Sequence, residues 1–96
     1  MSVETQPFDP AVYVETPEAA AAYLDEALAT NDAAFIADAL GVLARAKGMS
    51  GIAEAAGLGR QSLYKALATD GNPRFDTVLK VVGALGLRLS TVPIAD

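Results

Sequence analysis

The stretch MSGIAEAAGLGRQSLYKALA, residues 49–68, decides the fold of this chain. Two short segments with apolar residues at helical spacing, residues 50–56 and 60–68, flank a GLG tripeptide, where glycine allows a sharp, left-handed turn at Gly57. Ala53 precedes Gly57 by one turn, and its small side chain lets a second helix cross closely. The positions expected to be buried at this crossing are Ile52, Ala56, Leu58, Leu63 and Ala66. The spacing predicts a helix-turn-helix unit, whose second helix enters the major groove of DNA, with a generic helical hairpin as the alternative.

The second helix of this unit begins with polar side chains. If Leu63, Ala66 and Leu67 face inward, the side chains left facing outward are those of Arg60, Gln61, Ser62, Tyr64 and Lys65. This end of the helix reads base edges in such units, where Arg pairs with guanine and Gln with adenine. Tyr64 and Lys65 are also placed to reach phosphates. Residues 55–69 contain no acidic side chain, which favours a DNA-facing surface over an ordinary solvated helix.

Four further cations fall on neighbouring elements, where they either add phosphate contacts or are simply solvated: Arg45, Lys47, Arg74 and Lys80.

Helix signals also precede the unit. Thr16 suits a helix N-cap and Pro17 the first helical position, which predicts a helix running to Ala29. Asp32 follows a break at Asn31 and predicts the start of a second helix that ends near Lys47. Residues 1–15 show no helical period, and we expect an extended N-terminal arm or a packed tail there.

Further signals follow along the chain. Gly41 stands inside the second helix, where glycine is costly, and predicts a close approach by another helix. Residues 70–73, DGNP, predict a loop, and apolar residues at helical spacing predict a last helix over 75–85, closed by Gly86. Residues 87–92 alternate weakly, as a short strand does. The expected fold class is all-α, with about five helices and at most one short C-terminal strand, in a single domain of residues 16–96.

Composition limits the possible functions. The 96 residues fit one small domain, and the chain has no Cys, no His and no Trp. Because thiol and imidazole chemistry are both absent, we expect no enzyme, no cofactor and no metal site. No apolar run is long enough to cross a membrane, and the first ten residues do not resemble a secretory signal, so we expect a cytoplasmic protein.

The net charge of −5 is an average of two unlike parts. Residues 1–40 hold eight carboxylates and no Lys or Arg, whereas residues 41–96 hold seven cations and four carboxylates. An acidic part beside a basic part suggests two different partners, although two solvated surfaces would give the same pattern.

The string GMSGIAEAAGLGRQSLYKALATDGNPRFDTVLKVVGALGLRLS, residues 48–90, resembles a family of probable addiction-module antidote proteins. These are short HigA-like antitoxins with a helix-turn-helix of the Cro and lambda-repressor type. The upstream strings FDPAVY, residues 8–13, and AAYLDEAL, residues 21–28, also resemble that family. Many such repressors open the first helix of the motif with a Gln that binds the DNA backbone. Met49 stands there in this chain, which leaves Ser50 for that role, and Gly59 stands where the family commonly has Ser.

The resemblance implies a toxin partner and autorepression at operator DNA. Such antitoxins neutralise a small basic toxin of the RelE/ParE type, and an acidic N-terminal part suits a basic surface. The residues that we expect to contact the toxin are Phe8, Tyr13, Tyr23, Asp25 and Glu26. Helix-turn-helix proteins usually read two half-sites about 34 Å apart, which implies a homodimer. Residues 87–92 either pair with their twin across the dimer axis or pack on their own domain.

Two other functions fit the same residues. One is a helix-turn-helix transcriptional regulator that stands alone, without a toxin. The other is a protein-interaction module in which the helix-turn-helix no longer binds DNA.

Overall fold

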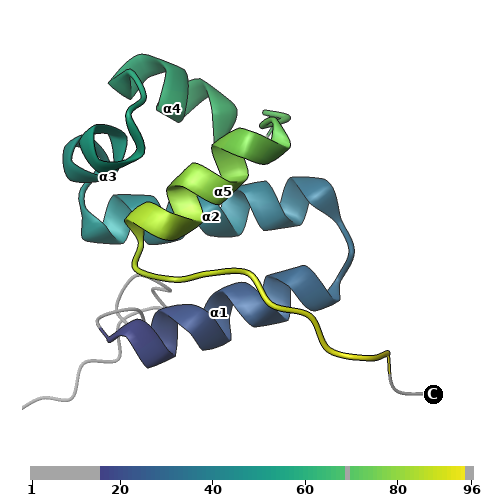
Figure 1. Cartoon of the computed structure of the whole chain (residues 1–96). Coiled ribbons are helices and arrows are strands. Elements are labelled where there is room, and N and C mark those ends of the chain that lie inside the picture. Colours follow the sequence, from purple (N-terminus) through teal and green to yellow (C-terminus); the bar gives the residue numbers. More distant parts are fainter. Residues whose placement is uncertain (1–15, 69, 95–96) are drawn as a thin grey trace, which may run out of the picture.

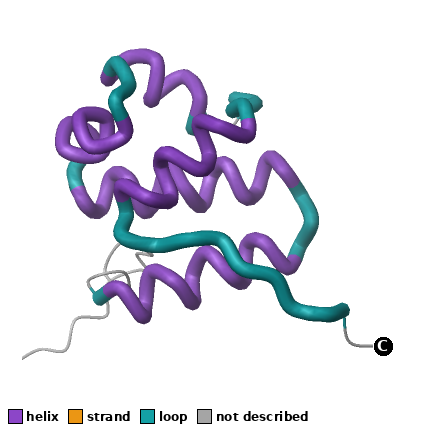
Figure 2. The backbone as a smooth tube through the Cα atoms, in the orientation of Figure 1, coloured by secondary structure: helices purple, strands orange, loops and turns teal. Residues whose placement is uncertain are grey.

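The computed structural model describes residues 16–68 and 70–94, and this part of the chain is helical. The five helices are α1 (Pro17–Ala29), α2 (Ala33–Lys47), α3 (Met49–Ala56), α4 (Arg60–Ala66) and α5 (Phe75–Ala84) (Figure 1). Loops alone connect them, and the described residues form no strand (Figure 2). The expected all-α class with five helices is confirmed, and the arrangement is compatible with a helix-turn-helix fold. The expected arm of residues 1–15 lies outside the described residues.

Side-chain caps start the first two helices where the sequence predicts them. The Thr16 hydroxyl accepts a hydrogen bond from the Ala19 amide at 3.0 Å, and Pro17 opens α1. An Asp32 carboxylate oxygen accepts from the amides of Ala34 and Phe35 at 3.0 and 3.3 Å. Each cap satisfies amides that have no partner inside their own helix, so it defines the helix start. Both helices also end at the predicted residues, Ala29 and Lys47.

The helices pack around one apolar core. The side chains most completely excluded from solvent are Leu40, Leu43, Leu63, Val81 and Val82. In the described part of the chain no polar or charged side chain is buried. Helix α1 packs on α2, α2 packs on α3 and α5, and α3 packs on both α4 and α5. Helix α4 therefore sits at the outside of the bundle, with one face on the core and the other in solvent.

Gly41 explains how α4 reaches α2. A Cβ atom added to Gly41 would lie 3.0 Å from the carbonyl oxygen of Leu67, the C-cap residue of α4. The predicted close approach at Gly41 is thus confirmed, and it is made by the end of α4.

The chain leaves α5 through a glycine turn. Gly86 has φ of +81°, and the Leu87 amide donates to the carbonyl of Val82 at 3.0 Å, as in a Schellman ending. We call residues 87–94 the C-terminal segment. Its inner side chains, Leu87 and Leu89, pack against the core, and the segment runs beside α1 (Figure 1).

The short strand expected over residues 87–92 is not formed. A strand needs a second extended segment to share its backbone hydrogen bonds. The described residues offer the C-terminal segment only helices, so it packs on its own domain through two leucines. None of the helices in residues 16–68 and 70–94 has the length and apolar character needed to cross a membrane.

Candidate nucleic-acid interface

The turn between α3 and α4 ends α3 and sets the direction of α4. Gly57 has φ of +73°, in the left-handed region that glycine adopts without strain. The Leu58 amide donates to the Ala53 carbonyl at 2.8 Å, and the Gly57 amide donates to the Glu54 carbonyl at 3.1 Å. These bonds make a Schellman ending and satisfy the last carbonyls of α3. The left-handed turn predicted at Gly57 is confirmed.

Apolar side chains hold α4 against α3. Ile52 and Ala53 of α3 are buried, and Leu63 of α4 has no exposed surface. Ala56 is also buried, whereas Leu58 and Ala66 are half-buried rather than fully enclosed. Leu63 therefore anchors the helix in the middle.

The helix boundaries here differ slightly from the sequence expectation. Helix α3 begins one residue early, at Met49, and α4 ends two residues early, at Ala66. Leu67 is the C-cap residue of α4, and its amide donates a hydrogen bond to the Leu63 carbonyl. Such differences at helix ends are small, and they leave the outward face of α4 unchanged.

The outward face of α4 carries the side chains predicted to contact DNA. The five exposed residues are Arg60, Gln61, Ser62, Tyr64 and Lys65. The guanidinium carbon of Arg60 lies 5.8 Å from the centroid of the Tyr64 ring, within the range of a cation–π contact. We call these five residues the α4 polar face. None of these side chains packs into the core, so their identities contribute little to the stability of the fold. Their polar groups are exposed and can contact a ligand.

Two neighbouring residues at the start of α3 differ in burial. Met49 is buried in the core, and Ser50 is exposed. The position that the sequence resemblance aligns with a DNA-binding Gln is therefore a packing position in this chain. Gly59 is the N-cap of α4 and offers no side-chain hydrogen bond to it. Ser50 is left as the hydroxyl at the start of α3 that a ligand could reach.

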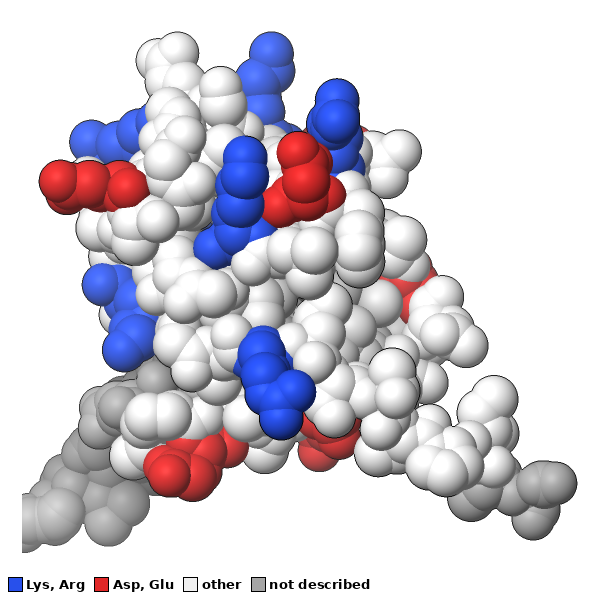
Figure 3. All heavy atoms as spheres, viewed as in Figure 1, with Lys and Arg blue, Asp and Glu red and all other residues white. Residues whose placement is uncertain are grey.

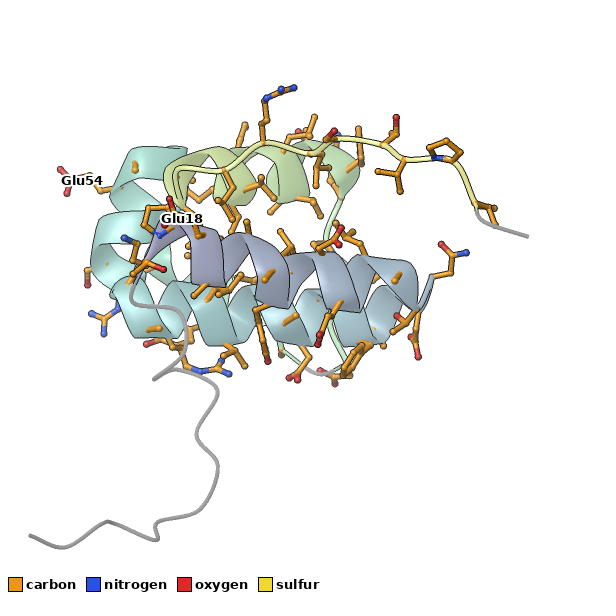
Figure 4. All side chains as sticks on the ribbon, turned by 90° about the horizontal axis from the view of Figure 1, so that it is seen from below. Glu18 and Glu54 are labelled. Carbon is orange, nitrogen blue, oxygen red and sulfur yellow. The ribbon has the colours of Figure 1, made fainter. Side chains whose placement is uncertain are left out.

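Charged side chains are mixed over the upper part of the molecule. Both signs of charge are visible there (Figure 3), since α3 carries one carboxylate and no cation and α5 carries one of each. On α3, Glu54 projects away from the helices, whereas Glu18 lies at the start of α1 (Figure 4). The α4 polar face itself carries two cations and no carboxylate.

One flanking cation is locally paired. Arg74 Nε donates to an Asp76 carboxylate oxygen at 3.3 Å, with both side chains mostly in solvent. Desolvation raises the pKa of Asp76, but the charge of Arg74, hydrogen bonds from the Thr77 amide and from Arg74, and the charge of Lys80 together hold this pKa below its usual value. An exposed pair of this kind stabilises a fold very little, so Arg74 stays free to exchange its partner.

Of the residues predicted to contact a toxin, those that the structure describes do not share one face. Phe8 and Tyr13 lie outside the described residues. Asp25 and Glu26 are exposed on α1, whereas Tyr23 is half-buried and packs against the core. Burial raises the pKa of the Tyr23 hydroxyl, the charge of Asp38 raises it further, and the charge of Arg45 opposes both. Tyr23 therefore belongs to the side of α1 that meets α2, away from Asp25.

The chain is similar to one described protein family. Residues 4–93 match the family described as probable addiction module antidote protein. A protein of Haemophilus influenzae, described as uncharacterized, is 44% identical over 88 residues, which span 92% of this chain and 91% of that protein. No solved structure matches the chain significantly. The family match spans nearly the whole chain, and the chain therefore belongs to the family of probable addiction module antidote proteins.

Proposed function

We propose that this protein is the antitoxin of a type II toxin–antitoxin module, and that it binds its own operator DNA and represses transcription. Family membership supports the antitoxin part and implies a toxin partner. The α4 polar face is the observation that supports DNA binding. It puts an Arg and a Gln at the start of an exposed helix that has no carboxylate.

The proposed reading of DNA follows from the position of these side chains. Arg60 and Gln61 begin α4, the end that reaches base edges when a helix enters the major groove. Arg pairs with both acceptors of guanine and Gln with adenine, and each such pair discriminates by about 1–3 kcal/mol. Lys65 stands one turn further along and suits a phosphate, which gives affinity without sequence preference.

A homodimer completes this proposal. Two copies of α4 separated by one helical turn of DNA would read a palindromic operator. The protein would act by binding rather than catalysis, in the cytoplasm where its operator lies.

The proposed toxin contact uses the acidic surface of α1. Glu18, Asp25 and Glu26 are all exposed there. A small basic toxin of the RelE/ParE type would be attracted to this surface, and charge complementarity of this kind mainly raises the association rate. The stand-alone regulator stays the second candidate, since the α4 polar face needs no toxin to bind DNA.

Binding to the promoter fragment that precedes the protein's own coding sequence tests the DNA-binding part. Fluorescence anisotropy compares this fragment with a scrambled fragment over a range of salt concentrations. We expect Arg60→Ala to lose about 1–3 kcal/mol of preference for the promoter fragment. Lys65→Ala removes the same charge from the same helix, and we expect it to weaken binding to both fragments equally and to reduce the salt slope by about one. Full preference in the Arg60→Ala variant would contradict the proposal.

Capture of the protein encoded in the adjacent reading frame tests the toxin part. We expect the double variant Asp25→Asn, Glu26→Gln to associate with it more slowly at low salt. The double variant Glu54→Gln, Asp70→Asn removes the same charge from outside α1 and should associate at the wild-type rate. Equal rates for the two variants would contradict the α1 contact, and absence of any complex would favour the stand-alone regulator.

A further inference from the structure

A groove of about 350 Å³ lies between α1 and the C-terminal segment. Its lining is mostly apolar, with Ala21, Ala22 and Leu28 on the helix side and Leu87 and Leu89 on the segment side, and the charged side chains of Asp25 and Arg88 lie at its border. Both alanines are exposed, so the helix wall of the groove is open to solvent. An open apolar groove of this size is suited to one or two aliphatic side chains.

The same segment carries two aliphatic side chains without cover. Val92 and Ile94 are 81% and 89% exposed, more than any other large apolar side chain in the described residues. By contrast, Leu87 and Leu89, which lie earlier in the segment, pack against the core. Exposed apolar groups that lie together mark a contact surface more often than single ones do.

A chain in this conformation does not fill its own groove. Residues 87–90 form the groove wall, and the segment then continues past the helices toward the C-terminal end (Figures 1 and 4). Val92 follows Ser90, a lining residue, by only two positions. The extended backbone therefore carries Val92 and Ile94 away from the space that residues 87–90 border.

We propose that a second copy of this chain fills the groove, with Val92 and Ile94 of each protomer docked between α1 and the C-terminal segment of the other. The inference deepens the homodimer of the proposed function, and it concerns the protein without DNA or toxin. Two extended segments that approach antiparallel about a twofold axis near residue 91 bring residues 92–94 of each chain beside residues 88–90 of the other.

Symmetry favours a second copy over an unrelated partner. In a twofold interface one surface must complement itself, so it has to carry both the projecting groups and the site that receives them. Here the projecting groups and one wall of the receiving groove both lie on the C-terminal segment, within eight residues. One association thus covers two grooves and four aliphatic side chains at once.

Sedimentation of the full chain at micromolar concentration tests the proposal. We expect the wild type to sediment as a dimer. The double variant Val92→Ser, Ile94→Ser should associate about a hundredfold more weakly, because burial of its polar side chains no longer contributes a favourable hydrophobic free energy. Ala22→Gln, on the opposite wall, should weaken the dimer as well. Gln suits an exposed helix position nearly as well as Ala, so the fold should persist, as circular dichroism would verify.

The matched control lies on α5. Phe75 and Leu79 are also exposed apolar side chains, and neither lines the groove. We expect Phe75→Ser, Leu79→Ser to dimerise as the wild type does. Loss of the dimer in this variant, with retention in Val92→Ser, Ile94→Ser, would move the interface to α5 and overturn the proposal. A wild type that stays monomeric would overturn it too.

A chemical crosslink gives an independent readout. The natural chain has no cysteine, so single-cysteine variants report one position each. Under mild oxidation, a mixture of Ala22→Cys and Ile94→Cys chains should form the mixed disulfide faster than a mixture of Ala22→Cys and Leu79→Cys. Equal rates would contradict the docking. Arg60→Ala should dimerise normally, so a failure of this proposal is distinguishable from a failure of DNA binding.

Discussion

The guanidinium carbon of Arg60 lies 5.8 Å from the ring centroid of Tyr64, one turn further along α4. The two side chains therefore support each other on the surface proposed to read DNA. Because Tyr64 is partly covered and Arg60 is exposed, the ring offers the longer side chain a fixed neighbour. Such a contact limits the directions in which Arg60 extends before any ligand binds.

Removal of the Tyr64 ring should weaken operator binding through Arg60. An exposed cation–π contact contributes about 0.5–1 kcal/mol, so Tyr64→Ala should lose about two- to fivefold in affinity for the promoter fragment. Tyr64→Phe keeps the ring and separates this effect from a phosphate contact by the hydroxyl. Anisotropy titrations of both variants measure the difference, and unchanged affinity in Tyr64→Ala would contradict a role for the pair.

Addition of a methyl group at Gly71 should destabilise the fold. A Cβ atom there would clash with the carbonyl oxygens of Ala66 and Lys65, at 2.6 Å from the latter, and backbone atoms have little freedom to move away. We expect Gly71→Ala to lower the free energy of unfolding by about 1–3 kcal/mol. Thermal melts monitored by circular dichroism measure the loss as a lower Tm.

Gly83 is the matched control for Gly71. It lies inside α5, and a Cβ atom there would meet nothing within 4 Å. Gly83→Ala should therefore raise the free energy of unfolding by up to about 1 kcal/mol, because Ala loses less backbone entropy in a helix. A lower Tm for Gly83→Ala would show that the α5 surface has a neighbour.

Loss of the Asp32 cap should destabilise α2. Its carboxylate accepts hydrogen bonds from two amides, which would have no partner in Asp32→Ala. The expected cost is about 0.5–2 kcal/mol in urea unfolding. Asp32→Asn keeps an acceptor oxygen at the same place and should stay close to wild type. If both variants lost the same stability, the charge rather than the cap would be responsible.

Tyr23 should make the fold less stable in alkaline solution. Burial and the Asp38 charge raise the pKa of its hydroxyl in the folded protein, whereas the unfolded chain has the ordinary value near pH 10. The unfolded state therefore loses its proton first as pH rises, and stability falls from about pH 10 upward through the folded pKa. Tyr23→Phe should reduce this fall, and Asp38→Asn should lower the Tyr23 pKa in an ultraviolet titration of the phenol.

Local signals in the sequence predicted most of the helices. Thr16 and Asp32 are caps because their side chains reach amides two or three residues away, and no distant contact is needed for that. Gly57 and Gly86 are turns because left-handed backbone suits glycine. The outward position of Arg60 and its neighbours on α4 followed from helical spacing alone. The binding roles of those residues stay predictions.

Local signals were wrong or silent where distant segments meet. Residues 87–92 alternate as a strand does, but a strand depends on a partner that the described residues do not supply. Met49 stands where the resemblance places a DNA-binding Gln, and no local signal showed that packing buries this side chain in the core. The sequence showed a glycine at position 71 only as part of a loop, although that glycine touches the end of α4.

The sequence by itself determined the five helices, the side-chain caps of α1 and α2 and the polar side chains of α4, because hydrogen bonds and apolar spacing within a few residues specify them. The tertiary structure alone decided which faces are covered. It packed Tyr23 against the core, placed Leu67 against Gly41, and left a groove beside two exposed aliphatic side chains. These relationships join residues far apart in the chain, and only the packing of whole helices brings them together.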